Sequence, residues 1–281
     1  MARKFLIIFM IILFAGGVSY SVENEKLRIA VTHPWLALLA NFIGGAEVEI
    51  IPLRVWNSGG ELVLSEKGKI LRELEKDSKI IAIDSNDLKS AGIDENNNKN
   101  FVIKCLYSPF PVKINSLSDP SVIPFVAQRI LTALSEWDVQ NYSHYQRRLA
   151  EFQARLSSSI LVGQVLKDIT FCDLSGSSGY LLMAAGAKIE RPESFDIWQN
   201  SNGKLDGFRE FIDSQRESNK AILIDDDTPA NIKRYLTGKN DIYKWERPPL
   251  DVDYPSFLHE QYISLWQNVT KKKNLPRNSK R

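Results

Sequence analysis

The chain has 281 residues, enough for one large domain or for two lobes that each bury a core. Hydrophobic residues make up 43% and charged residues 25%, a composition typical of globular proteins. The 36 basic and 34 acidic residues give a formal net charge of only +2, which argues against nucleic acid as a partner.

The first 21 residues predict a secretory signal peptide. Arg3 and Lys4 precede an apolar run from Phe5 to Phe14, and small residues then lead to Ser19-Tyr20-Ser21. This order is typical of a leader that is removed on export, so we expect a periplasmic chain. An uncleaved anchor is the alternative, although the run is shorter than the ~20 apolar residues of a membrane span. No cysteine follows the run to carry a lipid, and the mature chain has 34 basic and 34 acidic residues.

Residues 22–120 alternate between short strands and helices, which predicts a first α/β lobe. Thr32 is expected to cap the first helix, and Gly44-Gly45 to end it. The segment from Trp56 to Glu61 is interpreted as a glycine-containing loop. Strands are predicted at residues 27–31, 48–53, 79–83 and 101–107, and helices at residues 34–43 and 66–75.

Residues 121–160 predict two successive helices with a short break between them. Apolar residues recur at helical spacing from Val122 to Leu134 and again from Val139 to Ile160. At 1.5 Å per residue the second helix would be roughly 30 Å long, about the width of a small domain. Such a helix between two α/β halves suggests a spine that joins two lobes. The alternative is an ordinary long helix inside one domain.

The alternation restarts over residues 161–270, which predicts a second lobe. Strands are expected at residues 169–174, 221–224 and 242–245, and helices at residues 180–185, 205–214, 229–236 and 256–269. The predicted fold class is therefore α/β, with two Rossmann-like lobes of parallel sheet flanked by helices and joined by the spine. Residues 271–281 form a basic tail, which we expect to be disordered, with contact to an anionic membrane as the alternative.

The chain has two cysteines, Cys105 and Cys172, on predicted strands of different halves. We expect two separate buried thiols; a disulfide between them, as an exported protein could form, is the alternative.

Five short patterns resemble the zinc and manganese receptors of bacterial ABC importers, the group called cluster A-I. They are the strand–helix–Ile43-Gly44-Gly45–strand segment within Leu27–Leu53, then Asn115–Pro120, Trp137–Tyr145, Tyr180–Gly186 and Tyr262–Asn268. The resemblance covers nearly the whole mature chain. It implies two α/β lobes on a rigid helical spine, a small solute or metal ion held in the cleft between them, and delivery of that ligand to a membrane permease by a monomer.

The metal site that the resemblance implies departs from the pattern of the group. Three histidines and one acid hold the metal there, and no histidine is found at the matching positions here. By spacing, these positions are Glu61, Asn115, Ser175 and either Asp251 or Asp253. Oxygen ligands suit hard cations, and neutral amide and hydroxyl groups bind them weakly. We therefore expect no high-affinity zinc site.

Two alternatives follow for the cleft. Either it is empty of metal, or it holds another ligand against Trp56, Asn115 and the turn that begins at Ser175. A divalent ion, zinc or manganese, is the cofactor that the resemblance implies. Cys172 could supply a thiolate if it faced the cleft, but strand alternation puts it on the same face as Leu174, in a core.

Other polar groups have structural interpretations that we prefer. His33, His144 and His259 are expected to be ordinary structural or surface histidines. The run Asp225–Asp227 follows a strand, where open α/β folds place ligands, but it also suits a solvated turn that caps the next helix. The Ser175–Gly179 turn, between a strand and a helix, could hold an anion with its backbone N–H groups.

Three functions remain open at this point. The first is an exported solute-binding protein of an ABC importer with a degenerate metal site. The second is a non-transporting member of the same scaffold that binds an envelope or protein partner. The third, an exported hydrolase, is disfavoured because no nucleophile elbow, His-Glu-x-x-His helix or Cys/His pairing is present. We therefore predict that the chain is not an enzyme. The sequence does not identify the solute.

Overall fold

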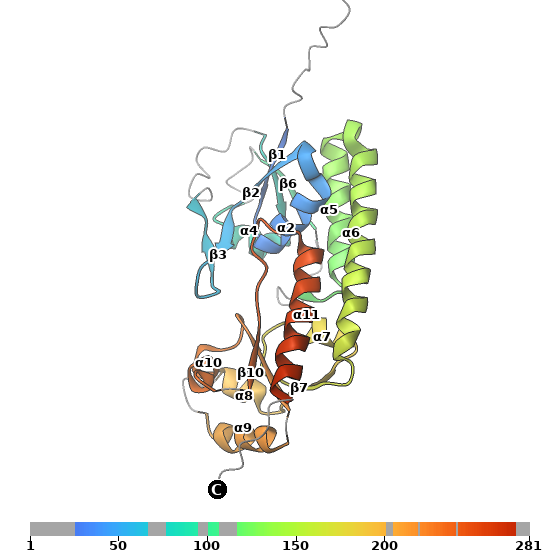
Figure 1. The fold of residues 1–281 in the computed structure, drawn as a ribbon. Helices are drawn as coiled ribbons and strands as arrows, with labels where there is room; N and C mark the ends of the chain where they lie inside the picture. Colours follow the sequence, from blue (N-terminus) through green and yellow to red (C-terminus); the bar gives the residue numbers. More distant parts are fainter. Residues whose placement is uncertain are drawn as a thin grey trace, which may run out of the picture.

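The computed structural model describes residues 26–66, 77–94, 101–106, 117–200, 205–218, 220–239 and 241–273. These residues form two four-stranded parallel sheets, with strand orders β2-β1-β5-β6 and β10-β9-β7-β8, and a small antiparallel hairpin of β3 and β4 (Figure 1). Within the described ranges the two large sheets share no strand. The predicted fold class, two lobes of parallel sheet flanked by helices, is therefore confirmed.

The first lobe contains β1 (Leu27–Val31), α2 (Pro34–Gly44), β2 (Val48–Pro52), β3 (Arg54–Trp56), β4 (Leu62–Leu64), β5 (Lys79–Ala82), α4 (Ser85–Ser90) and β6 (Val102–Cys105). Helix α2 buries nine of its eleven residues, because it lies between the sheet and the helices α5 and α6. A helix covered on both sides is apolar nearly all round, which explains why its sequence shows no polar face.

Two details of the first lobe differ from the sequence predictions. The N-cap of α2 is His33, whose Nδ1 accepts the Trp35 N–H at 3.2 Å. Thr32 does not cap the helix but donates its hydroxyl to the buried Asp87 carboxylate, which also pairs with Arg54. The residues around the predicted 56–61 loop form the β3–β4 hairpin, a two-stranded element too short to show alternation in the sequence.

The spine consists of α5 (Ile123–Trp137) and α6 (Tyr142–Gly163), separated by a 3-10 turn over Val139–Asn141. Helix α6 packs on α2 of the first lobe and on α11 (Tyr254–Lys273) of the second (Figure 1). One hydrophobic core runs continuously from β1 through α5 and α6 to β9, β10 and α11. The shared core fixes the two lobes against the same helix.

The break between α5 and α6 is held by Asp138, which accepts hydrogen bonds from the buried Tyr145 hydroxyl at 2.6 Å and the Asn141 amide at 2.8 Å. We expect Tyr145→Phe to lower the free energy of unfolding by about 1 kcal/mol, because it removes one buried hydrogen bond and keeps the ring. Urea denaturation measures this. Tyr142→Phe, on an exposed ring one turn earlier, is the matched control, and equal losses in both variants would contradict the prediction.

The second lobe contains β7 (Thr170–Asp173), α7 (Gly179–Ala184), β8 (Lys188–Glu190), α8 (Phe195–Asn200), α9 (Phe208–Glu217), β9 (Ala221–Asp225), α10 (Ala230–Leu236) and β10 (Ile242–Trp245). Strand β8 and helix α8 were not predicted from the sequence. Both are short, and β8 has one half-buried residue between two exposed charges, so neither leaves a periodic pattern.

The two cysteines are thiols on strands of different sheets, as predicted. Cys172 is buried with Leu174 in a second core, whereas Cys105 is only half-buried, so the prediction of two buried thiols is wrong for Cys105.

Some predictions fall on the ends of the chain. The signal peptide over residues 1–21 and the tail from residue 274 lie outside the described residues, and α11 continues through Lys273. In the described part of the chain, no helix combines the length and the apolar character that a bilayer span needs.

Candidate functional site

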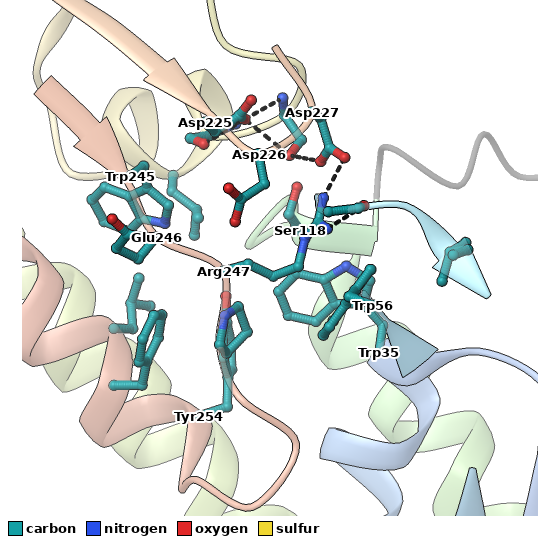
Figure 2. Close-up of a pocket in the computed structure, with 18 of the residues that line it drawn as sticks. Trp35, Trp56, Ser118, Asp225, Asp226, Asp227, Trp245, Glu246, Arg247 and Tyr254 are labelled. Atoms are coloured by element: carbon teal, nitrogen blue, oxygen red, sulfur yellow. Dashed lines mark hydrogen bonds and ion pairs between the residues drawn. The ribbon is translucent and has the colours of Figure 1, made fainter. Parts of the chain in front are cut away.

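A cavity of about 210 Å³ lies between the two lobes (Figure 2). The first lobe lines it with residues that follow β1 and with the β3–β4 hairpin, and the second lobe with residues that follow β9 and β10 and with the start of α11. Its main lining residues are His33, Trp35, Trp56, Gly60, Asp226, Asp227, Trp245, Glu246, Arg247 and Tyr254. The carboxyl ends of parallel strands are where open α/β sheets place ligands, so the cavity occupies the expected position.

His33 is a buried, neutral imidazole at the wall of the cavity. Its side chain is 1% exposed, and burial, with the positive charges of Arg54 and Arg247, lowers its pKa to about 3. Because Nδ1 accepts the Trp35 N–H, the ring proton lies on Nε2. Nε2 is buried and has no hydrogen-bond partner. His33 therefore offers one unused N–H donor at neutral pH.

Tyr254, which also lines the cavity, carries a second unused donor. Its hydroxyl is buried without a partner, and burial raises the pKa of the phenol well above its usual value. The ring packs edge-on against Trp35, with 5.2 Å between the centroids. An unsatisfied buried polar group costs about 1–3 kcal/mol, so two such groups at one cavity need an explanation.

Aromatic rings form much of the cavity wall (Figure 2). Trp35 and Trp56 meet edge to face at 5.8 Å, and Trp56 lies 6.3 Å from the His33 ring. Trp245 stands opposite and packs at 5.2 Å against the buried Tyr262 of α11. These rings come from three separate segments of the chain, which is why no aromatic motif marks the site in the sequence.

Arg247 joins the two lobes across the mouth of the cavity. Its Nη1 donates to the Gly60 carbonyl at 2.5 Å, its Nη2 pairs with Asp227, and its guanidinium lies 4.9 Å over the Trp56 ring. Gly60 has φ of 85°, and a Cβ there would stand 3.1 Å from the Cβ of Asp226. A glycine is needed at this hairpin tip both for the backbone and for the approach of the other lobe.

Three carboxylates lie on the second-lobe side of the cavity, each close to a cation. Asp226 and Glu246 share a single ammonium, that of Lys244, with 2.8 Å to each. Although partial burial opposes it, the two carboxylates raise the pKa of Lys244. Asp227 is paired with Arg247. A second ammonium, that of Lys233, donates to the Asp226 carbonyl at 3.0 Å, so carboxylates and cations are interleaved on this side of the cavity.

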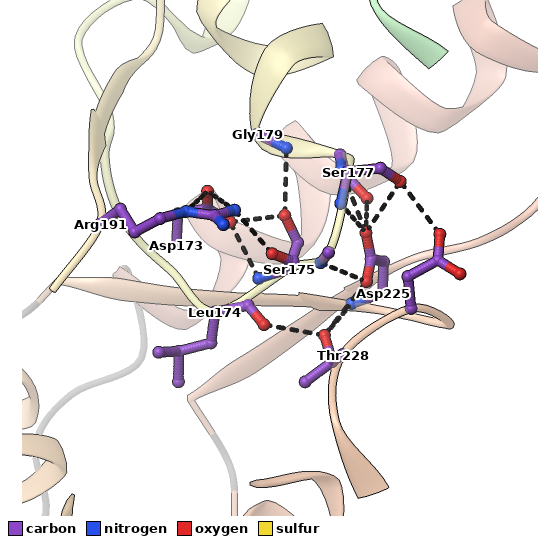
Figure 3. A network of polar contacts seen from close by, with 11 residues as sticks. Asp173, Leu174, Ser175, Ser177, Gly179, Arg191, Asp225 and Thr228 are labelled. Atoms are coloured by element: carbon purple, nitrogen blue, oxygen red, sulfur yellow. Dashed lines mark hydrogen bonds and ion pairs between the residues drawn. The ribbon is translucent and has the colours of Figure 1, made fainter. Parts of the chain in front are cut away.

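The Ser175–Gly179 turn does bind an anion, but that anion is the Asp225 carboxylate of the same chain (Figure 3). Asp225 accepts the backbone N–H groups of Gly176, Ser177 and Ser178 at 2.8, 2.9 and 3.0 Å and the Ser178 hydroxyl at 2.6 Å. Burial alone would raise the pKa of Asp225, but these hydrogen bonds hold it below its ordinary value. The interpretation of Asp225 as a solvated turn residue is therefore wrong.

The structure separates the positions carried over from the metal receptors. Ser175 is fully buried; its hydroxyl donates to Asp173 at 2.5 Å and accepts the Gly179 N–H at 3.1 Å (Figure 3). Glu61 is exposed at the hairpin tip and accepts from the Asn57 amide at 3.1 Å. Neither side chain lines the cavity, whereas Trp56 does.

The remaining carried-over positions do not complete a metal site. Asp253 accepts from Arg155 of α6 at 2.8 Å and from the Ser256 N–H at 2.9 Å, Asp251 is exposed, and Asn115 lies outside the described residues. Cys172 belongs to a core, where burial raises the pKa of the thiol to about 12. Over the described ranges, no three His, Cys, Asp or Glu side chains gather closely enough to hold a metal ion.

Sequence reasoning placed His33 at the start of the first helix, close to where a lobe faces the cleft, but preferred a structural role for it. His144 is half-buried on α6 and His259 is exposed on α11, and neither lines the cavity. The position is explained by the topology, because His33 follows the carboxyl end of β1 just as Asp226 follows that of β9.

Comparisons with known proteins place the fold. No protein-family model and no curated protein matches the chain. Solved structures do match, among them a ZnuA deletion mutant with zinc bound, at 16% identity and a TM-score of 0.64, over 86% of this chain and 97% of the other. The chain has the fold of these binding proteins.

Two further solved structures show how widely this fold is used. The solute-binding protein FpvC from Pseudomonas aeruginosa in complex with Mn²⁺ matches at 13% identity and a TM-score of 0.63, over 88% of this chain and all of the other. The laminin-binding adhesin Lmb from Streptococcus agalactiae matches at 14% identity and 0.61, over 87% and 100%. The resemblance given by the sequence motifs is confirmed for the fold, and these neighbours are binding proteins.

Proposed function

We propose that the chain is an exported solute-binding protein of an ABC importer that holds its ligand in the cavity between its lobes. The cavity carries this proposal, because it lies where two lobes on a common spine meet and Arg247 bonds one lobe to the other across it. In this proposal residues 1–21 are cleaved on export, and the chain acts as a periplasmic monomer that delivers its ligand to a membrane permease.

The metal site of the related receptors is degenerate in this proposal. Glu61, Ser175 and Asp253 are occupied by hydrogen bonds within their own segments or with α6, and His33 has its Nδ1 lone pair engaged at the N-cap of α2. Coordination of an ion by Nε2 would move the ring proton to Nδ1 and break that cap.

We expect chelator-stripped, tag-free protein to show no stoichiometric Zn²⁺ or Mn²⁺ site of submicromolar affinity in calorimetric titration at pH 7.5, where an accessible histidine would be neutral. A single tight site that disappears in Glu61→Ala or Asn115→Ala would mean that the metal site is altered rather than lost.

The transport function is tested first by whether the neighbouring genes encode a permease and an ATPase, and then in proteoliposomes that contain that pair. We expect the chain to stimulate ATP hydrolysis, and Arg247→Ala, which removes the bond between the lobes, to stimulate it less. Absence of a permease gene nearby, or of any stimulation, would count against the proposal.

The second candidate is a non-transporting member of the scaffold that binds a protein, since an adhesin shares the fold. Loss of stimulation together with specific binding to an envelope protein would favour it. An exported hydrolase gains no support from the cavity, because Nε2 of His33 bonds to no hydroxyl or thiol that it could activate.

A further inference from the structure

We propose that the cavity between the lobes binds a small organic zwitterion, with an apolar α-amino acid as the simplest molecule that meets its chemistry. The inference rests on the proposed function in taking this cavity as the ligand site, and it names the class of ligand. Three separate features of the cavity each specify one part of the ligand (Figure 2).

The first feature is the pair of unused donors, His33 Nε2–H and the Tyr254 hydroxyl. Both are buried, both lack a partner, and their rings both pack in the aromatic cluster around Trp35 and Trp56. A donor pair is satisfied by oxygen acceptors on the ligand. A carboxylate, which carries two acceptor oxygens and accepts stronger hydrogen bonds than a neutral carbonyl, suits the two donors best.

The second feature is the pair of carboxylates beside Lys244, those of Asp226 and Glu246. Asp226 points into the cavity from the end of β9, and Glu246 follows β10, with one ammonium between the two carboxylates. A protonated amine on the ligand would pair with these carboxylates, whose remaining lone pairs can accept its hydrogen bonds. Carboxylates on this side and two N–H and O–H donors at His33 and Tyr254 together favour a ligand with opposite charges at its two ends.

The third feature is the apolar wall between these ends. Trp35, Trp56 and Trp245, with Leu181 and Phe257, cover the middle of the cavity. Ligand sites usually combine such walls with a few placed polar groups, and they span ~300–1,000 Å³ for drug-sized ligands. At about 210 Å³ this cavity suits a smaller body, such as one aliphatic or aromatic amino-acid side chain.

The test compares matched ligands by calorimetric titration of the exported chain. L-valine, L-leucine and L-phenylalanine carry both charged ends, phenethylamine lacks the carboxylate of L-phenylalanine, and 3-phenylpropionate lacks its amine. We expect at least one of the amino acids to bind. If L-phenylalanine binds, phenethylamine and 3-phenylpropionate, which each keep one charged end, should bind at least tenfold more weakly. If L-valine or L-leucine binds instead, the amine and the acid with the same side chain are the analogues to compare.

Two conservative variants assign the ends. Tyr254→Phe should weaken binding of the amino acid and of the acid analogue by about tenfold, which corresponds to ~1.4 kcal/mol. Binding of the amine analogue should not change. Asp226→Asn should weaken binding of the amino acid and of the amine analogue, and binding of the acid analogue should not change. Asp251→Asn, at an exposed acid away from the cavity, is the control. Should Tyr254→Phe fail to fold, Asp226→Asn decides alone.

Binding to none of the three amino acids, or equal binding of the zwitterion and a one-ended analogue, would overturn the inference. Stimulation of the transporter by the chain would then still support the proposed function, with a different solute. Amino-acid binding without any stimulation would leave the ligand class standing and reject the role in transport.

Discussion

Replacing Asp225 with asparagine is expected to lower the free energy of unfolding by about 2–4 kcal/mol. The carboxylate is 4% exposed and accepts three backbone N–H groups of the Ser175–Gly179 turn and the Ser178 hydroxyl. An amide keeps the shape but loses the charge, and its NH₂ group would face donors that have no other acceptor. The turn closes the end of β7 at the cavity, so both stability and ligand binding should suffer.

Urea denaturation at pH 7 measures the loss, and Asp226→Asn is the matched control from the same segment. Asp226 pairs with the partly exposed Lys244, so its replacement should cost no more than about 1 kcal/mol. Ser178→Ala, which removes one of the donors to Asp225, should fall between the two. A difference below about 0.5 kcal/mol between the two asparagine variants would contradict the role given to Asp225.

The Ser175–Gly179 turn shows how far the sequence could predict this site. A short serine- and glycine-rich turn between a strand and a helix presents successive N–H groups, and the sequence analysis gave anion binding there as an alternative that it did not prefer. The sequence does not give the distance between segments, so it could not show that β9 brings Asp225 to the same turn from 47 to 49 residues away. The predicted anion site is therefore occupied by the chain itself.

The lobes and the spine were predictable because their patterns are local. Buried parallel strands are continuous apolar runs, as in Ile80 and Ile81 of β5, and the stripe of α6 through Tyr145, Leu149 and Phe152 has helical spacing. The shared core that fixes the lobes to the spine involves residues from both ends of the chain, and no local pattern shows it.

Positions carried over by spacing were less informative about the site. Spacing places Glu61 near the hairpin tip, yet its neighbours Gly60 and Leu62 line the cavity while its own side chain is exposed. Along a strand a shift of one residue turns a side chain to the other face. Within this hairpin, family spacing could give the segment but not the side chain that faces the ligand.

Acidification from pH 7 to 4.5 is expected to cost the wild-type chain about 2–3 kcal/mol of stability through His33 alone. The pKa of this imidazole is about 3 in the folded chain against 6.5 in the unfolded one, because burial and the charges of Arg54 and Arg247 oppose protonation. Between these values the unfolded state binds more protons. The contribution of the neutral ring is therefore fully present above pH 6.5 and is lost as the pH falls toward 3.

His33→Asn isolates this effect, because asparagine does not titrate in the window and is a good N-cap for α2. Urea denaturation of both proteins at pH 7 and 4.5 should show a loss on acidification that is about 2–3 kcal/mol larger for the wild type, while other titrating groups cancel in the comparison. His259→Asn, at an exposed histidine of α11, should lose as much as the wild type. Equal losses in the wild type and His33→Asn would mean that solvent protons reach His33 in the folded chain. An imidazole that takes up a proton so easily could not serve as a neutral N–H donor to a ligand.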